Sequence, residues 1–345
     1  MIIKHRQDMK AVGIKTSLPI DAADSFIEFE APKPQPSGRE LLIKIHAIAV
    51  NPVDFKIRQN SAKDTVLDTP KILGWDAAGV VEAVGDQVTL FKTGDKVYYA
   101  GDITKAGSNA EYQLVDERIV GRKPETLNDV EAASVPLTAL TAWEILFDRI
   151  RVSPVKDKGK AVLIIGGAGG VGSIAIQLAK KIVGLTVIAT ASRPETADWV
   201  KTMGADHVVN HKDLVNEVHK AGFTHVDFIL DFVDTNGYWD AMAELIKPQG
   251  HIASITGSGQ PVLLNKLKNK SVSFSWEFMF TRSSWHTEDI AEQHHILNNV
   301  AALIDNGTLQ HTLQQTLTGL TAENLKQAHR LLESGKTIGK IAIRL

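Results

Sequence analysis

The chain contains no cysteine among its 345 residues. This absence excludes disulfide bonds, catalysis by a thiolate and every zinc site built with cysteine ligands. Its apolar stretches are about strand length, well short of the roughly 20 residues that span a bilayer. Residues 1–8 carry charges where a signal peptide needs an apolar core. We therefore expect a cytoplasmic protein with no membrane partner.

The chain also lacks an excess of charge of either sign. Its 38 basic and 40 acidic residues give a net charge of −2. With no basic stripe interleaved with aromatic residues, we expect no nucleic-acid partner. A hydrophobic content of 43% is typical of globular enzymes, and 345 residues suggest two domains.

A glycine cluster follows five apolar residues at 161–165. The spacing Gly-x-Gly-x-x-Gly, followed by a helical pattern and a second apolar run at 186–190, predicts a strand, a phosphate-binding turn and a helix of a dinucleotide site. A glycine-rich turn without a ligand is the alternative. The expected cofactor-binding residues are Gly167, Gly169, Gly170, Val171 and Gly172.

The organisation of the chain changes twice along its length. Residues 1–128 are rich in β-like runs and turn signals, whereas residues 129–275 alternate strand and helix, which predicts a doubly wound parallel sheet. Residues 276–345 hold two helical patterns, at 287–306 and 321–334, and a terminal strand, so we expect this tail to fold back onto the first domain. The strands expected in the alternating domain are 161–165, 186–190, 207–209, 226–231 and 251–255.

Eight motifs occur in order along nearly the whole chain. They are Asn51-Pro-Val-Asp54-Phe-Lys56, Leu73 to Gly85, Gly94-Asp-Lys-Val97, Ala110-Glu-Tyr112, Pro136 to Trp143, Gly159 to Lys180, Phe274 to Arg282 and Ile338-Gly-Lys340. Together they resemble the quinone oxidoreductase branch of the medium-chain dehydrogenase/reductase superfamily, and its bacterial zinc-type alcohol dehydrogenase-like subgroup. The resemblance implies an α/β fold: a β-rich GroES-like catalytic domain (1–128), a Rossmann domain (129–275), a C-terminal segment (276–345) that completes the first domain, and a cofactor cleft between the two domains. It also implies a homodimer joined through the Rossmann sheets.

The same resemblance places a catalytic zinc on a cysteine, on the histidine of a Gly-His-Glu motif and on a further cysteine or acid. This chain has Asn51 at the cysteine position and Gly74-Trp75-Asp76 at the Gly-His-Glu motif. An amide and an indole do not replace a thiolate and an imidazole as zinc ligands. His294 and His295 are adjacent, so they point to different faces of a helix and are expected to be helix-face residues. We expect no metal.

The end of the second strand bears on the choice of cofactor. An NAD enzyme places Asp or Glu about 20 residues past the glycines, but this chain has Ser192 and Arg193 there. An arginine with no competing carboxylate favours the 2′-phosphate of NADPH. Alternatively, Ser192 only caps the next helix, which we expect from Pro194 to just before Gly204. By the family's pattern, His211 lines the adenosine ribose or its phosphate, with a plain surface turn as the alternative.

The residues expected to contact the nicotinamide ring of the cofactor are assigned partly by the family resemblance. Thr138 and Thr141 lie where the family has cofactor-facing threonines, with helix packing as the alternative. Val233 and Thr256 follow strands at the edge where open parallel sheets bind ligands.

On the substrate side, Asn51 would stabilise negative charge on a carbonyl oxygen, while Asp54 either joins it or caps the helix that follows. Tyr99, with Lys56 and Trp75, would line the cleft, or each is only structural.

These features predict a zinc-independent, NADPH-dependent oxidoreductase that transfers a hydride to a quinone or an α,β-unsaturated carbonyl acceptor. The alternatives within the class are an enal or enone reductase and a zinc-type alcohol dehydrogenase. A different class is a non-catalytic crystallin-like or RNA-binding protein, since such roles occur among quinone reductase relatives.

Overall fold

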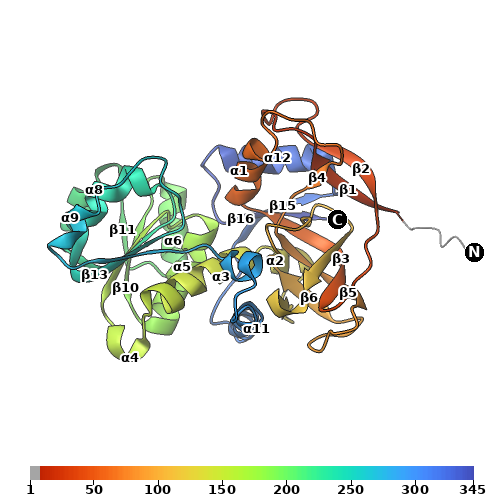
Figure 1. Ribbon diagram of the computed structural model, residues 1–345. Helices are drawn as coiled ribbons and strands as arrows, with labels where there is room; N and C mark the ends of the chain where they lie inside the picture. Colours follow the sequence, from red (N-terminus) through yellow and green to blue (C-terminus); the bar gives the residue numbers. More distant parts are fainter. Residues whose placement is uncertain (1–7) are drawn as a thin grey trace, which may run out of the picture. The chain divides into compact units, whose positions relative to one another are not determined.

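The computed structural model describes residues 8–345 (Figure 1). Within them the chain forms two compact units. Unit 1 comprises the chain up to Leu137 together with Phe280–Leu345, and unit 2 comprises Thr138–Met279. The sequence predicts domain boundaries after residues 128 and 275, a few residues before these two transitions.

Unit 2 is built on a parallel sheet of six strands in the order β11-β10-β9-β12-β13-β14. Its central strand β9 is buried at every position, which is why it reads as a continuous apolar run rather than an alternating one. The order reverses direction after β9, as in a doubly wound sheet. The strands are β9 (Ala161–Ile165), β10 (Thr186–Thr190), β11 (His207–Val209), β12 (Val226–Asp231), β13 (Ile246–Ser254) and β14 (Ser273–Trp276).

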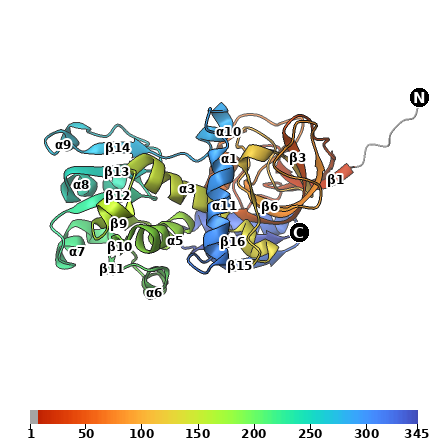
Figure 2. The ribbon, with the colours of Figure 1, turned by 90° about the horizontal axis from the view of Figure 1, so that it is seen from below.

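Helices cover both faces of this sheet. Figure 2 shows α7 and α8 on one side of the strands and α5 on the other. Trp239 and Met242 of α8 pack against Leu163, Ile229 and Ile252 in the core beneath it. The helical segments are α3 (Pro136–Trp143), which begins at the end of unit 1, π-helical η2 (Glu144–Ile150), α4 (Pro154–Asp157), α5 (Gly170–Gln177), η3 (Leu178–Val183), α6 (Pro194–Met203), η4 (His211–Asp213), α7 (Leu214–Lys220), α8 (Thr235–Leu245) and α9 (Asn265–Lys268).

Unit 1 contains a seven-stranded sheet in which the C-terminal strands pair with strands from the first 122 residues. The order is β15-β16-β3-β5-β6-β8, and β7 also pairs with β3. A smaller sheet has the order β2-β1-β4. The strands are β1 (Asp8–Ile14), β2 (Ile27–Pro32), β3 (Glu40–Val50), β4 (Lys71–Ile72), β5 (Asp76–Val84), β6 (Lys96–Tyr99), β7 (Tyr112–Asp116), β8 (Val120–Arg122), β15 (Leu313–Thr318) and β16 (Lys340–Arg344).

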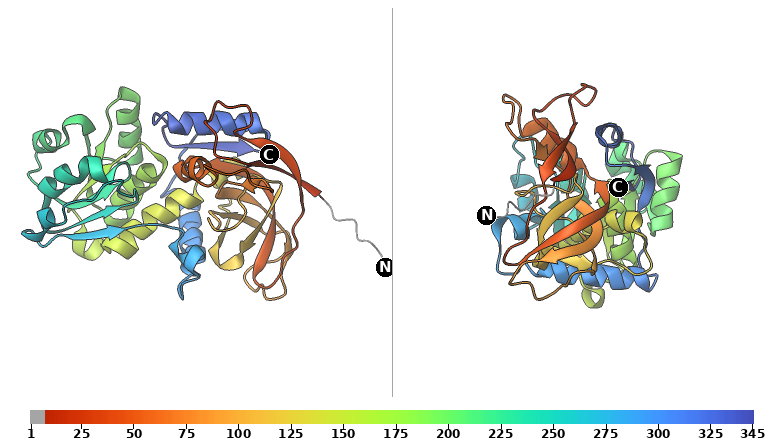
Figure 3. Two further views of the ribbon diagram at one scale, coloured as in Figure 1. Left: turned by 45° about the horizontal axis from the view of Figure 1, so that its top comes forward. Right: turned by 90° about the vertical axis from the view of Figure 1, so that its right-hand side faces the viewer.

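The helices of unit 1 lie around this sheet, and α12 contacts α1. In Figure 3 the dark blue C-terminal segment lies beside the red and orange N-terminal strands of the same unit. The helical segments are α1 (Pro52–Asn60), η1 (Glu117–Ile119), α2 (Asp129–Ala133), α10 (Thr281–Trp285), α11 (Glu292–Asp305) and α12 (Ala322–Glu333).

The strand register explains how distant residues meet in unit 1. Strand β16 runs antiparallel to β3 with Ile341 opposite Val50, and β5 runs antiparallel to β3 with Asp76 opposite Ala49. The end of β3 and the beginnings of β5 and β16 therefore lie at one edge. This confirms the prediction that the C-terminal tail folds back onto the first domain.

The predicted elements agree with the structure, with specific differences. Strand β13 begins at Ile246, five residues before the predicted start, and β14 and β15 were not predicted. Both are short strands with several polar residues, so their apolar signal is weak. Helix α11 begins at Glu292 rather than at residue 287, because the Thr287 hydroxyl donates to Asp289 Oδ1 at 2.7 Å and stabilises a turn.

Candidate functional site

The glycine cluster forms the turn between β9 and α5 in unit 2. Gly166 has a φ of +88°, a conformation that favours glycine. Its N–H donates to Thr190 Oγ1 of β10 at 2.9 Å. Helix α5 begins after Gly169, whose position provides no side-chain cap. The first turn of α5 thus presents backbone N–H groups, which suit an anion such as a phosphate.

The glycines of this turn have different steric roles. A Cβ on Gly172 would lie 2.2 Å from Gly166 O, and one on Gly167 would lie 2.9 Å from Ala189 Cβ. Both positions therefore exclude side chains because the chain packs closely there. A Cβ on Gly169 would meet only Gly166 O at 3.5 Å. The absence of a side chain at Gly169 is not required by the turn itself, and leaves the helix entrance open.

The loop after β12 is held above the glycine turn by Asp231. Val233 N and Asp234 N donate to Asp231 Oδ1 at 3.0 and 3.2 Å. A Cβ on Gly166 would lie 2.7 Å from Val233 Cγ2. The predicted cofactor residue Val233, whose side chain is 51% exposed, thus lies directly over the turn.

A buried hydroxyl network joins this loop to the end of β13. Ser254 Oγ and Thr256 Oγ1 donate to Asp231 Oδ2 at 2.9 and 3.2 Å, and Thr235 Oγ1 donates to Thr256 O at 2.6 Å. Each hydroxyl thus has an acceptor for its single hydrogen, which makes the network mutually consistent. It fixes the predicted residue Thr256 at the carboxyl edge of the sheet.

The residues predicted to bind the adenosine end follow β10 and β11. Ser192 and Arg193 lie between β10 and α6, and Arg193 Nη1 is 3.4 Å from Glu195 Oε1. His211 Nδ1 is 3.2 Å from the Tyr238 hydroxyl.

The alternative interpretation, in which Ser192 caps the next helix, is wrong, because the N-cap of α6 is Arg193. Pro194 at the first helical position forces the residue before it into an extended conformation, and Arg193 has φ −112° and ψ 148°. Its backbone N–H donates to Thr196 Oγ1 at 3.1 Å. The predicted limits of the helix itself are confirmed.

A buried polar cluster lies in unit 1 where β3, β5 and β16 meet. It consists of Asn51, Asp54, Asp76 and Lys340, none more than 3% exposed. Asn51 Nδ2 donates to Asp76 Oδ2 at 2.9 Å. Lys340 Nζ donates to that same oxygen at 2.9 Å, to Val50 O at 2.8 Å and to Asn51 Oδ1.

Two carboxylates of this cluster contact helix N-termini. Asp54, at the third position of α1, accepts the Asn51 backbone N–H at 2.9 Å. It therefore caps α1, the helix that contains it, and not a helix that begins after it. Asp76 Oδ1 accepts Leu137 N, at the beginning of α3, at 2.8 Å. Carboxylates at these positions compensate free N–H groups and the helix dipole. Helix α3 also carries the predicted residues Thr138 and Thr141, both buried.

Burial raises the pKa of Asp54 to about 7. The hydrogen bond from Asn51 and the positive charge of Lys340 favour the carboxylate, and the negative charge of Asp76 opposes it. Desolvation is the largest of these effects, because the carboxylate is removed from water in the interior of the unit. Asp54 Oδ1 has no hydrogen-bond partner among the described residues.

The other predicted substrate-side residues have structural partners. The Tyr99 hydroxyl donates to Gln113 Oε1 at 2.9 Å, and burial raises the pKa of this phenol. Trp75 Nε1 donates to Asp102 O at 3.2 Å, whereas Lys56 is exposed on α1. Neither Tyr99 nor Trp75 shares a hydrogen bond with the polar cluster.

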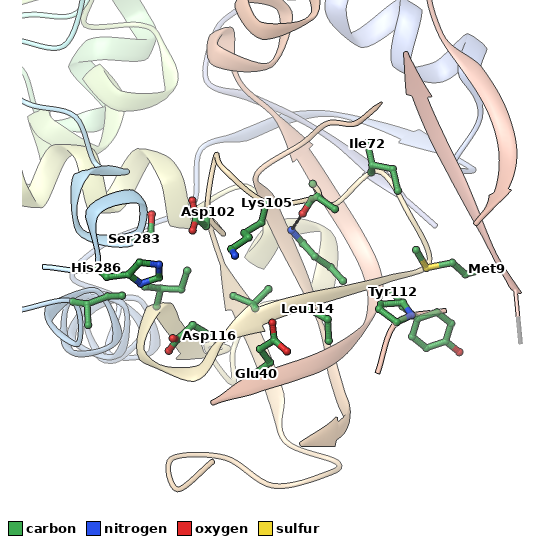
Figure 4. A pocket seen from close by; sticks show the side chains of 17 residues that line it. Met9, Glu40, Ile72, Asp102, Lys105, Tyr112, Leu114, Asp116, Ser283 and His286 are labelled. Carbon is green, nitrogen blue, oxygen red and sulfur yellow. Dashed lines mark hydrogen bonds between the residues drawn. The ribbon is translucent and has the colours of Figure 1, made fainter. Parts of the chain in front are cut away.

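A separate cavity of about 270 Å³ lies in unit 1 beyond Asp102 (Figure 4). Met9, Ile72 and Ile119 supply apolar walls, and Lys105 and His286 supply polar groups. None of the site residues predicted from the sequence lines it. This cavity therefore does not mark the predicted site.

Sequence reasoning missed four residues that organise these sites. Thr190 and Asp231 support the glycine turn and the Val233 loop, and Asp76 and Lys340 complete the cluster around Asn51. Asp231 ends a buried strand, a position that signals a ligand edge. Lys340 ends the Ile338-Gly-Lys340 motif, but it lies 289 residues from Asn51, so only strand pairing shows that the two residues are in contact.

The residues of the polar cluster do not fit a zinc ion. The positions implied as ligands hold an amide and a buried indole, and Lys340 places an ammonium between Asn51 and Asp76. Among residues 8–345 there is no group of three or more histidines and carboxylates arranged to hold a metal. His294 lies on α11 with Nδ1 2.6 Å from Val120 O, and His295 is exposed on the same helix, as expected of helix-face residues.

No helix in the described part of the chain is both long and apolar enough to cross a membrane.

Comparisons with known proteins agree with this architecture. The family model of the alcohol dehydrogenase GroES-like domain matches residues 37–125, and that of zinc-binding dehydrogenases matches residues 203–343. The chain is 46% identical over 340 residues to a zinc-type alcohol dehydrogenase-like protein of Staphylococcus epidermidis, covering 98% of this chain and 100% of that one. It is 36% identical over 236 residues to a chloroplastic NADPH-dependent alkenal/one oxidoreductase of Arabidopsis thaliana, covering 66% and 58% of the two chains.

Solved structures of oxidoreductases have the same fold as this chain. A Rhizobium etli protein, described as a zinc-dependent alcohol dehydrogenase, superimposes with a TM-score of 0.94 at 48% identity over 99% of both chains. The quinone oxidoreductase of Coxiella burnetii superimposes with a TM-score of 0.80 at 27% identity over 98% of this chain and 100% of that one. The chain is thus an oxidoreductase of the medium-chain dehydrogenase/reductase superfamily and belongs to its zinc-type alcohol dehydrogenase-like subgroup.

Proposed function

We propose that this protein is an NADPH-dependent reductase that transfers a hydride to a quinone or an α,β-unsaturated carbonyl compound without a catalytic zinc ion. The observation that carries the proposal is the glycine turn of unit 2, whose uncapped α5 N-terminus is open at Gly169. Bound NADPH supplies the hydride, and the protein holds and aligns the reactants.

The residues after β10 support NADPH rather than NADH. No carboxylate lies between Thr190 and Arg193, so the acidic residue with which NAD enzymes bind the ribose hydroxyls, and which would repel a 2′-phosphate, is missing. Arg193 pairs with Glu195 across 3.4 Å, and both side chains are substantially exposed. A pair of this kind is weak in water, so the guanidinium can exchange that partner for a phosphate, which it binds in a bidentate manner.

The Asn51 amide is the group we assign to the acceptor side of the reaction. When a hydride adds to a quinone or an enone, negative charge develops on the carbonyl oxygen. Asn51 uses one hydrogen of its amide for Asp76, which leaves a second N–H to stabilise that oxygen. The names of the relatives support both acceptor classes.

The proposed absence of zinc depends on the chemistry of the donor set. Zinc sites in proteins use thiolate, imidazole or carboxylate ligands, and here a lysine ammonium donates hydrogen bonds to both Asn51 and Asp76. A zinc-type alcohol dehydrogenase activity is the alternative that this argument disfavours.

We further propose that the protein acts in the cytoplasm as a homodimer joined through β14, the edge strand of the unit 2 sheet. Trp276 of β14 and Phe278 just beyond it are 48% and 49% exposed. An unpaired strand edge next to two exposed aromatic side chains favours pairing with a second copy.

The test is a screen of NADPH oxidation over quinones, enals, enones and simple aldehydes, with and without a chelator. We expect turnover of quinones or enones that is unchanged by the chelator, together with a preference for NADPH over NADH. Loss of activity on chelation that zinc restores would contradict the metal-free assignment. Salt-sensitive RNA binding without turnover of any acceptor would contradict the choice of reaction.

A further inference from the structure

The ammonium of Lys340 is enclosed by oxygen atoms. It donates to Val50 O, Asn51 Oδ1 and Asp76 Oδ2, and an ammonium has three hydrogens to donate. The Lys340 residue is only 3% exposed. The cation is therefore fully coordinated inside the protein by one backbone, one amide and one carboxylate oxygen.

This coordination determines the orientation of the Asn51 amide. An ammonium donates only, so the amide atom facing Lys340 must be the oxygen. A carboxylate accepts only, so the amide atom facing Asp76 must be the nitrogen. The alternative orientation would place Nδ2 against the ammonium and Oδ1 against the carboxylate, which is repulsive on both sides. Lys340 and Asp76 together thus aim the amide that we assign to the substrate oxygen.

The same ammonium also supports the entry into α3. Asp76 shares one oxygen between Lys340 and Asn51 and offers the other to Leu137 N at 2.8 Å. Thr138, predicted to face the cofactor, is the next residue of α3. Without the ammonium, Asp76 would be a buried carboxylate next to Asp54, with no positive charge to balance it.

We propose that Lys340 is the resident cation of this site: it takes the electrostatic role of a metal ion, orients Asn51 and Asp76 for catalysis, and excludes divalent cations. Lys340 is a positioning residue, because it acts through Asn51 rather than on the substrate. The kinetic part of this inference rests on the proposed reductase function, whereas the parts on metal binding and thermal stability do not.

The first experiment replaces the tethered cation with a free one. In Lys340→Ala we expect the melting temperature to fall by about 10 °C, because a buried carboxylate loses its partner. We expect kcat to fall about 10- to 100-fold, as when a supporting partner of a site residue is lost. Propylammonium, which matches the deleted part of the side chain, should restore both, whereas 1-propanol at equal ionic strength should not. Lys92→Ala, at an exposed lysine of the same unit, is the matched control and should behave as wild type.

The second experiment separates positioning from charge balance. The double variant Lys340→Met with Asp76→Asn removes both charges, so we expect its melting temperature to recover. Its kcat should stay low, because the Asn51 amide is no longer held in its orientation. KM for the acceptor should change less than about threefold. Lys340→Arg keeps the charge and should retain more activity than Lys340→Met. If Lys340→Ala does not yield folded protein, the double variant supplies the kinetic readout.

The third experiment measures zinc directly. After dialysis against ZnCl₂ and then buffer, we expect wild-type protein to retain much less than one zinc per chain by elemental analysis. One retained zinc per chain that is lost in Asn51→Ala would overturn the inference. So would wild-type kcat in Lys340→Met, or full recovery of kcat in the double variant. If no acceptor is reduced by wild-type protein, the reductase proposal fails, while the zinc measurement and the rescue of melting temperature still decide the role of Lys340.

Discussion

At the scale of single residues, charged groups in this protein act mainly through the neighbours that they orient. Arg193 illustrates this on the surface, where its backbone begins α6 and its guanidinium lies near Glu195. Lys340 illustrates it in the interior, where three oxygens surround one ammonium. We assign the exposed arginine to a ligand and the buried lysine to the organisation of the site.

The role of Arg193 is tested by changing the cofactor. Arg193→Ala should raise KM for NADPH about 10- to 100-fold and leave KM for NADH nearly unchanged, because a charge-assisted bond contributes about 1.5–3 kcal/mol. Steady-state kinetics with both cofactors measures this. Lys201→Ala, at an exposed lysine of the same helix, is the control. Equal losses with NADPH and NADH would refute the assignment.

Asp54 predicts a pH dependence of stability. Its pKa of about 7 in the folded protein is above the ordinary 3.8 of the unfolded chain. The folded state thus binds this proton more tightly than the unfolded chain does, so protonated Asp54 stabilises the fold. This stabilisation is fully present below about pH 4 and is lost as pH rises through about 7. Lys340 and Asp76 are the charged neighbours that adjust this value.

Asp54→Asn isolates this contribution, because the amide oxygen still accepts the Asn51 N–H. We expect the difference in unfolding free energy, wild type minus variant, to decrease by a few kcal/mol between pH 4 and pH 8. Denaturant titrations across this range measure it. Parallel curves for the two proteins would show that Asp54 does not titrate there.

At the scale of elements, the turn between β9 and α5 separates two uses of glycine. Gly172 is required by packing, because a Cβ would lie 2.2 Å from a carbonyl oxygen, whereas Gly169 has only an ordinary contact at 3.5 Å. Gly172 is therefore required by the packing of the turn, and we assign Gly169 to the ligand.

Alanine substitutions test this division. Gly172→Ala should lower the free energy of unfolding by about 1–3 kcal/mol and with it the melting temperature. Cofactor binding should be impaired as a consequence. Gly169→Ala should leave the melting temperature within about 1 °C and weaken NADPH binding at least about tenfold, because the methyl group obstructs the approach of the pyrophosphate. Thermal denaturation and NADPH fluorescence titration give the two readouts. Unchanged NADPH affinity in Gly169→Ala would argue against the phosphate site.

At the scale of the whole molecule, unit 2 is one continuous segment, whereas unit 1 needs both ends of the described chain. The C-terminal strand β16 completes the sheet of unit 1 and delivers Lys340 to its polar cluster. The fold of unit 1 is therefore not complete until the last strand has paired.

The proposed dimer is tested at the edge of unit 2. Trp276→Glu should convert a dimer to a monomer at micromolar concentration, because it replaces an exposed aromatic side chain of the edge strand β14 with a charge. Light scattering after size-exclusion chromatography measures the mass. Trp285→Glu, at another exposed tryptophan that lies in unit 1, serves as control. A monomeric wild-type protein would contradict the proposal.

Much of unit 2 could be predicted from the sequence. Strands β9, β10, β11 and β12 match the predicted runs in both limits, because buried parallel strands are continuous apolar segments. The short strands β14 and β15 could not be predicted, since their stability comes from pairing with neighbours rather than from local pattern. The alternative of Ser192 as a helix cap failed because Pro194 determines the backbone conformation of Arg193, which thereby becomes the N-cap.

The sequence alone determined the chain's α/β class, its glycine turn, the lack of cysteine ligands and the replacement of expected metal ligands by Asn51 and Trp75. These are local properties, carried by residue type and spacing. Only the tertiary structure decided that Lys340 enters the Asn51 cluster, that Asp231 holds the Val233 loop and that Gly169 is the open glycine. Such contacts depend on strand register between residues up to 289 positions apart, which no local pattern encodes.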